Sequence, residues 1–179
     1  MEKTWRWFGK KDKITLQMLR QIGVEGIVTA LHDVPNGEIW TLEAIEDLKQ
    51  YIESYGLRWS VVESLPVCEA IKYAGPEREQ LIENYKISLA NLGKAGVKTV
   101  CYNFMPVFDW LRSELEHAQP DGANALAYDH AEVLKMDPLK GELSLPGWDS
   151  SYTKEGMKAL LEKYKGISEE DLWNNLKYF

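Results

Sequence analysis

The chain repeats one pattern three times: the end of a helical segment, a glycine, and then a short apolar segment. The three copies are IGVEGIVTA (22–30), YGLRWSVVE (55–63) and AGVKTVCYN (95–103). Their apolar segments show no clean polar alternation, which is typical of strands buried in a parallel sheet. Strands that alternate with helices in this way predict βα units and an α/β fold.

The pattern predicts four strands. A weaker first strand has Trp5 and Trp7 on one side of an extended segment and Arg6 on the other. The four predicted strands are Thr4–Phe8, Gly26–Ala30, Arg58–Glu63 and Lys98–Asn103.

Helical periodicity fills the segments between the strands, with predicted helices over Thr15–Ile22, Thr41–Tyr55 and Pro76–Ala95. Thr41 is a good N-cap because its hydroxyl can accept a hydrogen bond from a free amide of the first turn. Gly56 follows its helix where a left-handed residue is expected, and Gly96 repeats this arrangement.

The alternation ends after Asn103. Four of the seven prolines lie between residues 104 and 147, and the tract 104–152 is interpreted as an irregular insertion. Helices are expected again over about 153–179, where Ser168 and Asp171 have the spacing of a capping pair. Four βα units are half of an eight-stranded barrel, which takes about 250 residues.

Composition excludes several classes of function. The formal net charge of -7, without a basic cluster, argues against nucleic acid as a partner. No stretch approaches the roughly 20 apolar residues of a membrane span, and the N-terminus lacks a signal-peptide core, so a cytoplasmic protein is expected. Cys68 and Cys101 lack CxxC spacing and predict neither a zinc site nor a disulfide framework.

Long segments of the chain resemble the mannonate dehydratase family, and together they cover essentially all of it. These segments are TWRWFG (4–9), VTALHDVPNGEIW (28–40), WSVVESLPV (59–67), VCYNFMPVFDWLRSEL (100–115) and DPLKGELSLPGWDSSYTKE (137–155).

The resemblance implies a (β/α) TIM barrel of the xylose-isomerase-like type, of which residues 1–179 form the N-terminal part, about the first four βα units. It implies a hydro-lyase that removes water from D-mannonate to give 2-keto-3-deoxy-D-gluconate in hexuronate (glucuronate) catabolism. Members of the family are roughly twice as long, are expected to be homo-oligomers, and bind Mn²⁺ or Fe²⁺. Their metal ligands are expected beyond Phe179, so no metal ligand is assigned in this sequence.

In a parallel barrel the reacting groups lie at the carboxyl ends of the strands. Dehydration of a sugar acid requires a cation for the carboxylate, a base for the α-proton and an acid for the departing hydroxyl. No residue is assigned as that base. The residues predicted to bind substrate are Arg6, Trp7, His32, Asn36, Glu63, Ser64 and Asn103.

Five of these residues have a structural alternative. Arg6 suits a bidentate carboxylate contact but could be a surface residue on an edge strand. His32 could bind a hydroxyl or transfer a proton, or simply pack in its loop. Glu63 could contact hydroxyls or be an ordinary salt-bridged carboxylate, Asn103 could stabilise a loop, and tryptophans such as Trp7 most often fill cores.

Two other functions remain open from the sequence. A sugar isomerase or epimerase of the same barrel type would use similar metals and bases. A catalytically inactive truncated scaffold is the third hypothesis, because half a barrel leaves sheet edges exposed.

Overall fold

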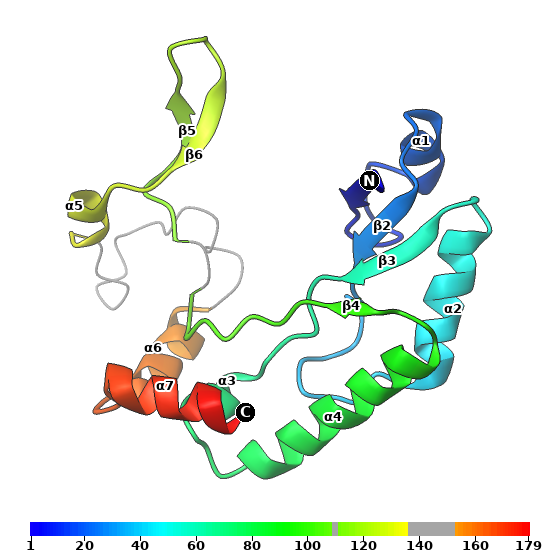
Figure 1. Cartoon of the computed structure of the whole chain (residues 1–179). Coiled ribbons are helices and arrows are strands. Elements are labelled where there is room, and N and C mark those ends of the chain that lie inside the picture. The colour runs from blue at the N-terminus through cyan, green and yellow to red at the C-terminus, as the bar shows by residue number, and fades with distance from the viewer. Residues whose placement is uncertain (109–110, 136–152) are drawn as a thin grey trace. The chain divides into compact units, whose positions relative to one another are not determined.

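A parallel sheet of four strands organises the N-terminal part of the chain (Figure 1). The computed structural model describes residues 1–108, 111–135 and 153–179. Neighbouring strands in the sheet are also neighbours along the chain, and every pair is parallel. The strands are β1 (Thr4–Arg6), β2 (Gly26–Thr29), β3 (Arg58–Val62) and β4 (Thr99–Val100).

All four predicted strands are present, and their pairing continues beyond the regular strands. Past β1, the Trp7 amide donates to the Val28 carbonyl at 2.9 Å. Past β3, the Glu63 amide donates to the Thr29 carbonyl at 3.0 Å. The predicted strands therefore end later than the observed ones because the chain stays hydrogen-bonded for a further residue or two.

The helices between the strands also follow the prediction, with α1 (Leu16–Gln21), α2 (Leu42–Glu53) and α4 (Arg78–Lys94). The Thr41 hydroxyl accepts from the Ala44 amide at 3.2 Å, which confirms the N-cap of α2. Gly56 and Gly96 have φ angles of 70° and 83°, so both adopt the left-handed conformation expected after a helix. One short helix, α3 (Glu69–Lys72), was not predicted, because four residues are too few to show a helical period.

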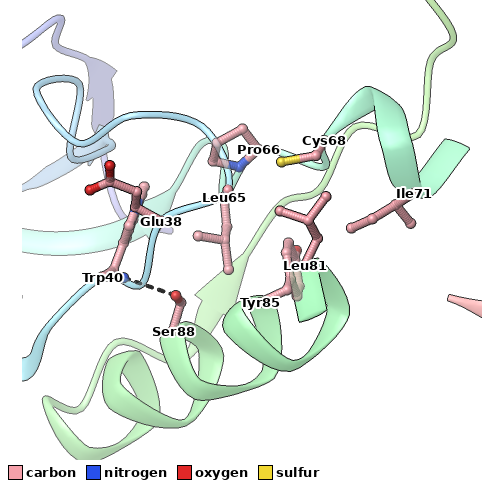
Figure 2. A pocket seen from close by; sticks show the side chains of 10 residues that line it. Glu38, Trp40, Leu65, Pro66, Cys68, Ile71, Leu81, Tyr85 and Ser88 are labelled. Carbon is pink, nitrogen blue, oxygen red and sulfur yellow. Dashed lines mark hydrogen bonds between the residues drawn. The ribbon is translucent and has the colours of Figure 1, made fainter. Parts of the chain in front are cut away.

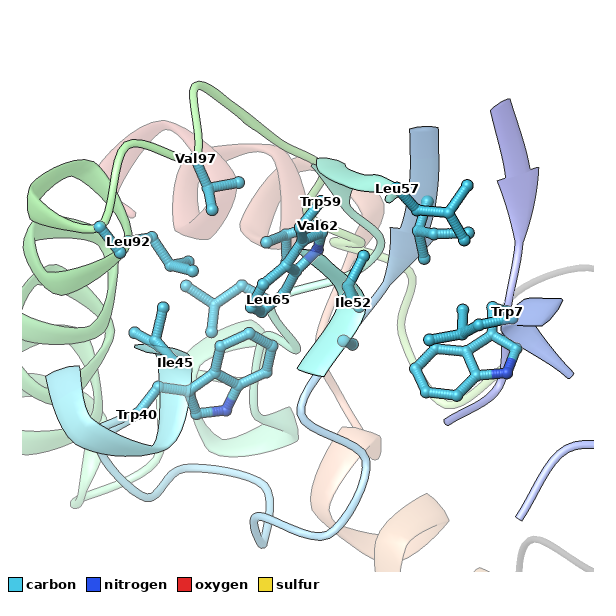
Figure 3. Close-up of a cluster of buried hydrophobic side chains, with 14 of the residues drawn as sticks. Trp7, Trp40, Ile45, Ile52, Leu57, Trp59, Val62, Leu65, Leu92 and Val97 are labelled. Carbon is cyan, nitrogen blue, oxygen red and sulfur yellow. The ribbon is translucent and has the colours of Figure 1, made fainter. Parts of the chain in front are cut away.

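Side chains from α1, α2 and α4 form one hydrophobic cluster with the sheet. Figure 3 shows the part of this cluster that α2, α4 and β3 contribute. Ile45 and Ile52 of α2 and Leu92 of α4 are fully buried there. Trp59 and Val62 enter the cluster from β3. These helices therefore pack on a single side of the sheet, since one continuous core receives side chains from all of them.

The chain divides into two compact units, of which the first comprises Met1–Phe104 and Trp173–Phe179 and the second Met105–Leu172. The second unit contains an antiparallel hairpin of β5 (Glu114–Ala118) and β6 (Asn124–Ala127). The short α5 (His130–Val133) follows it, and α6 (Lys154–Tyr164) lies further along the chain.

The hairpin lies in the tract predicted to be irregular. Every residue of β5 is exposed, so no apolar alternation marks it in the sequence. The Asp121-Gly122 pair lies in the turn between β5 and β6, with the Asp121 carboxylate accepting from the Ala123 amide at 3.0 Å. Residues 109–110 and 136–152 of the predicted irregular tract lie outside the described residues.

The last helix, α7 (Glu169–Tyr178), begins with the predicted capping pair. The Ser168 hydroxyl accepts from the Asp171 amide at 3.1 Å, and the Asp171 carboxylate accepts from the Ser168 amide at 2.9 Å. No helix in the described part of the chain is long and apolar enough to cross a membrane.

Candidate active site

The carboxyl ends of the four parallel strands meet at one edge of the sheet and bring polar side chains together there. Arg6, at the end of β1, forms an ion pair with Glu63, which follows β3. Their side chains are 39% and 41% exposed, so the pair is open to solvent and to a ligand. The Arg6 guanidinium also lies 5.1 Å from the centre of the Phe8 ring.

Strand register explains why residues so distant in sequence meet. Arg6 pairs with Val28, and Val28 pairs with Val61. Side chains at paired positions of a sheet share a face, and so does the residue two further on. Glu63 therefore lies on the same face as Arg6, and this is the face opposite the helix-packed Ile27 and Trp59.

One nitrogen of Arg6 has an unusual environment. Its Nε is buried and finds no hydrogen-bond acceptor among the described residues. A guanidinium has five N–H donors, so the contact with Glu63 leaves most of them available. Arg6 is therefore a partly oriented cation with spare donors at the sheet edge.

Ser64 and Asn103 form a second pair at the ends of β3 and β4. The Asn103 amide nitrogen donates to the Ser64 hydroxyl at 3.3 Å, and both residues are half-buried. Together they offer a hydroxyl, an amide donor and an amide acceptor, which suits neutral hydroxyl groups.

His32 follows β2 and contacts the buried Thr29. The Thr29 hydroxyl lies 2.6 Å from the Trp7 carbonyl oxygen and 3.4 Å from His32 Nε2. Partial burial of the imidazole lowers the pKa of His32, and the positive charge of Arg6 acts in the same direction. The Trp7 carbonyl and the Asp33 carboxylate oppose this shift in the pKa of His32 without cancelling it.

Trp7 contributes its main chain to this group, and its indole lies elsewhere. The indole is buried in the hydrophobic cluster and stacks on Tyr51 with 6.1 Å between ring centres. Successive residues of an extended segment point to opposite faces, so Trp7 faces the helices where Arg6 faces away. A direct contact of the Trp7 indole with substrate stays a prediction.

Asn36 lies in a different place from the other predicted residues. Its side-chain oxygen accepts from the Cys68 thiol at 3.0 Å. Cys68 lines a cavity of about 10 Å³ next to Leu65 and Tyr85, roughly the space of a single water (Figure 2). Among the described residues no contact joins Asn36 to the Arg6 and Glu63 pair.

A larger cavity of about 420 Å³ adjoins His32, which is within the usual size range for small-ligand sites. The loops after β1 and β2 line it together with α2. Lys10, one of its lining residues, has its ammonium 4.6 Å from the centre of the Tyr51 ring. The Lys11 ammonium lies 3.5 Å from the Asp33 carboxylate, and both residues line the same cavity.

Sequence reasoning missed three contributors to this region: Thr29, Phe8 and Lys10. Thr29 carried a detectable signal, because it is the only hydroxyl in the apolar segment GIVTA. Phe8 and Lys10 carried none, since their contacts depend on how the loop after β1 folds.

The described residues do not fit a Mn²⁺ or Fe²⁺ site. Within residues 1–108, 111–135 and 153–179, no group of three or more His, Cys, Asp or Glu side chains is arranged to hold a metal ion. No step of a reaction is therefore assigned to a metal held by this part of the chain.

The fold and the polar edge define the class: a parallel α/β protein that gathers polar side chains at the carboxyl ends of its strands, where such folds place their ligand sites. The profile of the D-mannonate dehydratase (UxuA) family matches residues 1–179, and the chain belongs to this family.

Individual relatives agree with the family match. The chain is 55% identical over 181 residues to the mannonate dehydratase of Streptococcus suis (strain 05ZYH33), and 53% identical over 180 residues to that of Streptococcus uberis. These matches cover 100% of this chain and 50% and 52% of the two relatives. The chain therefore spans about half the length of the curated relatives it matches.

A solved structure supports the fold. The crystal structure of mannonate dehydratase from Streptococcus suis serotype2 superposes with a TM-score of 0.84 at 49% sequence identity. The superposition covers 99% of this chain and 48% of that structure's chain.

Proposed function

We propose that this chain forms part of a hydro-lyase that dehydrates D-mannonate to 2-keto-3-deoxy-D-gluconate in hexuronate catabolism. The observation that carries the proposal is the match of the D-mannonate dehydratase family over residues 1–179. The chain supplies one section of the substrate site, centred on Arg6 and Glu63.

The reaction assigns simple tasks to these residues. The C2–H bond and the C3–O bond of the sugar acid break, water leaves, and the resulting enol becomes the 2-keto acid. Arg6 binds the substrate carboxylate through its remaining donors, oriented by Glu63. Ser64 and Asn103 bind hydroxyl groups, and His32 accepts a hydrogen bond from another. The base that removes the C2 proton is not assigned within this chain.

The proposal also includes a (β/α) barrel of the xylose-isomerase-like type. Sequential strand order and helices packed on one side of the sheet are the arrangement of a barrel segment. An open parallel sheet is normally covered by helices on both faces. In a barrel, the face that carries Arg6 and Glu63 would point to the interior.

A chimera tests this function. Residues 1–179 replace the matching half of the Streptococcus suis relative, and the purified protein is supplied with Mn²⁺ and D-mannonate. We expect release of a 2-keto acid, with the parent relative as positive control. A cooperatively folded chimera that interconverts aldoses but leaves mannonate unchanged would instead support a sugar isomerase, and one with neither activity would support an inactive scaffold.

Replacing Arg6 by lysine in the chimera tests the carboxylate contact. Arg6→Lys keeps the charge but loses the planar fork of donors, so KM for D-mannonate should rise on the order of tenfold, the size of one charge-assisted hydrogen bond. The matched control is Arg58→Lys, because Arg58 pairs with Glu2 and lies at the start of β3, away from the carboxyl edge. Equal KM values for the two variants would contradict the role of Arg6.

Three further parts of the proposal concern the protein at the length of its relatives. We propose that it binds Mn²⁺ or Fe²⁺ through residues outside the described part of this chain, that it is a homo-oligomer, and that it is cytoplasmic. Metal analysis and light scattering of the purified chimera test the first two, and cell fractionation tests the third.

A further inference from the structure

The hydroxyl of Thr29 has only one proton, and its surroundings decide where that proton goes. The Thr29 oxygen lies 2.6 Å from the carbonyl oxygen of Trp7. A carbonyl has no proton to donate, so two oxygens at this distance are attractive only if the hydroxyl is the donor. Thr29 is fully buried, and water therefore does not compete for this bond.

The donor role towards Trp7 leaves the Thr29 oxygen as an acceptor towards its other neighbour. That neighbour is His32 Nε2, at 3.4 Å. A neutral imidazole has one N–H and one bare nitrogen, and only an Nε2 that carries the proton can donate to this oxygen. The lone pair then belongs to Nδ1.

The ring of His32 is also held in place by its neighbours. The Phe8 ring lies 6.3 Å from it, centre to centre. Gly9 approaches so closely that a Cβ at this position would lie 3.4 Å from His32 Cδ2, and its φ angle of +91° favours glycine. Thr29, Phe8 and Gly9 thus all lie next to the ring.

We propose that Thr29 is a positioning residue that holds His32 in the Nε2–H tautomer, so that the bare Nδ1 accepts a hydrogen bond from a ligand hydroxyl at the 420 Å³ cavity. The ligand chemistry is that of a polyhydroxy acid, and this identity alone rests on the proposed function. The tautomer is a property of the chain itself.

The test is nitrogen NMR of the 179-residue chain above pH 7, where the lowered pKa of His32 keeps the ring neutral. The charged groups around the ring are Arg6 and Asp33, with Lys10, Lys11 and Asp47 lining the same cavity. The chain has three histidines, so His117→Gln and His130→Gln together leave His32 as the single signal. We expect Nε2 to resonate as a protonated nitrogen and Nδ1 as an unprotonated one.

Two substitutions of Thr29 separate its hydroxyl from its bulk. Thr29→Val keeps the shape without the hydroxyl, and the tautomer ratio should fall roughly three- to tenfold, the effect of one hydrogen bond. Thr29→Ser keeps the hydroxyl and should preserve the ratio. Ser88→Ala is the control, because it removes another buried hydroxyl, one that bonds Trp40 and Asn84.

The results separate this inference from the proposed function. A wild-type His32 with its proton on Nδ1 overturns the inference, and so does a tautomer ratio in Thr29→Val equal to that of Thr29→Ser. An Nε2–H tautomer in a chimera that leaves D-mannonate unchanged would overturn the proposed substrate and leave the role of Thr29 intact.

Discussion

His32 loses part of its hydration where it packs against Phe8 and Gly9, and this loss lowers the pKa of His32. The pKa of a histidine in an unfolded chain is about 6.5. Below that pH the unfolded chain binds a proton that the folded chain resists, so folding becomes less favourable as the pH falls. The stabilising contribution of the neutral ring is fully present above the unfolded pKa.

We therefore predict that the free energy of unfolding decreases as the pH falls from 7.5 to 5.5, and that His32→Gln reduces this decrease. Urea denaturation at several pH values measures the effect. His117→Gln is the comparison, because it removes an exposed histidine of the hairpin instead of the partly buried one. Parallel curves for the wild type and His32→Gln would contradict the prediction.

At the scale of single elements, α2 shows how one helix serves both the core and the surface. Its inner face buries Ile45 and Ile52 completely, and both pack in the cluster with Trp59 and Val62. Its outer face leaves Leu42 39% exposed. The stability that α2 contributes should therefore be concentrated in the inner face.

Alanine substitutions on the two faces of α2 test this distribution. Ile45→Ala removes fully buried methyl groups and leaves a cavity, which should lower the free energy of unfolding by about 2–5 kcal/mol. Leucine and alanine have similar helix propensities, and Leu42 lies on the outer face. Leu42→Ala should therefore change the free energy of unfolding by about 0.5 kcal/mol or less. Chemical denaturation compares them, and equal losses would show that α2 is not anchored through Ile45.

At the scale of the whole molecule, charge sets which partners are compatible. The chain has 28 acidic side chains against 21 lysines and arginines. A phosphate backbone is repelled by such an excess, and binding to nucleic acid depends on clustered cations.

We predict that the chain does not bind a labelled DNA duplex in fluorescence anisotropy at about 150 mM salt, because it has no basic run to displace counterions. The same measurement at about 50 mM salt is the more sensitive condition. Binding that weakens steeply with added salt would contradict the prediction.

Local signals in the sequence determined most of the elements and their ends. Thr41 and Gly56 mark the limits of α2 through contacts within a few residues, and Ser168 caps α7 in the same way. The hairpin was missed because β5 is exposed throughout and β6 is at most half-buried, so burial left only a weak pattern in the sequence. The residues at the carboxyl ends of the strands were predictable because parallel strands share one edge.

Tertiary structure decided which of those residues meet. Arg6 and Glu63 pair across β2 because strand register places them on one face, while Trp7, one residue along, turns its indole into the core. Asn36 contacts Cys68 instead of the pair. The sequence by itself determines propensities and caps, because these act over a few residues. Register and side-chain facing depend on contacts between distant segments, and only the folded chain determines them.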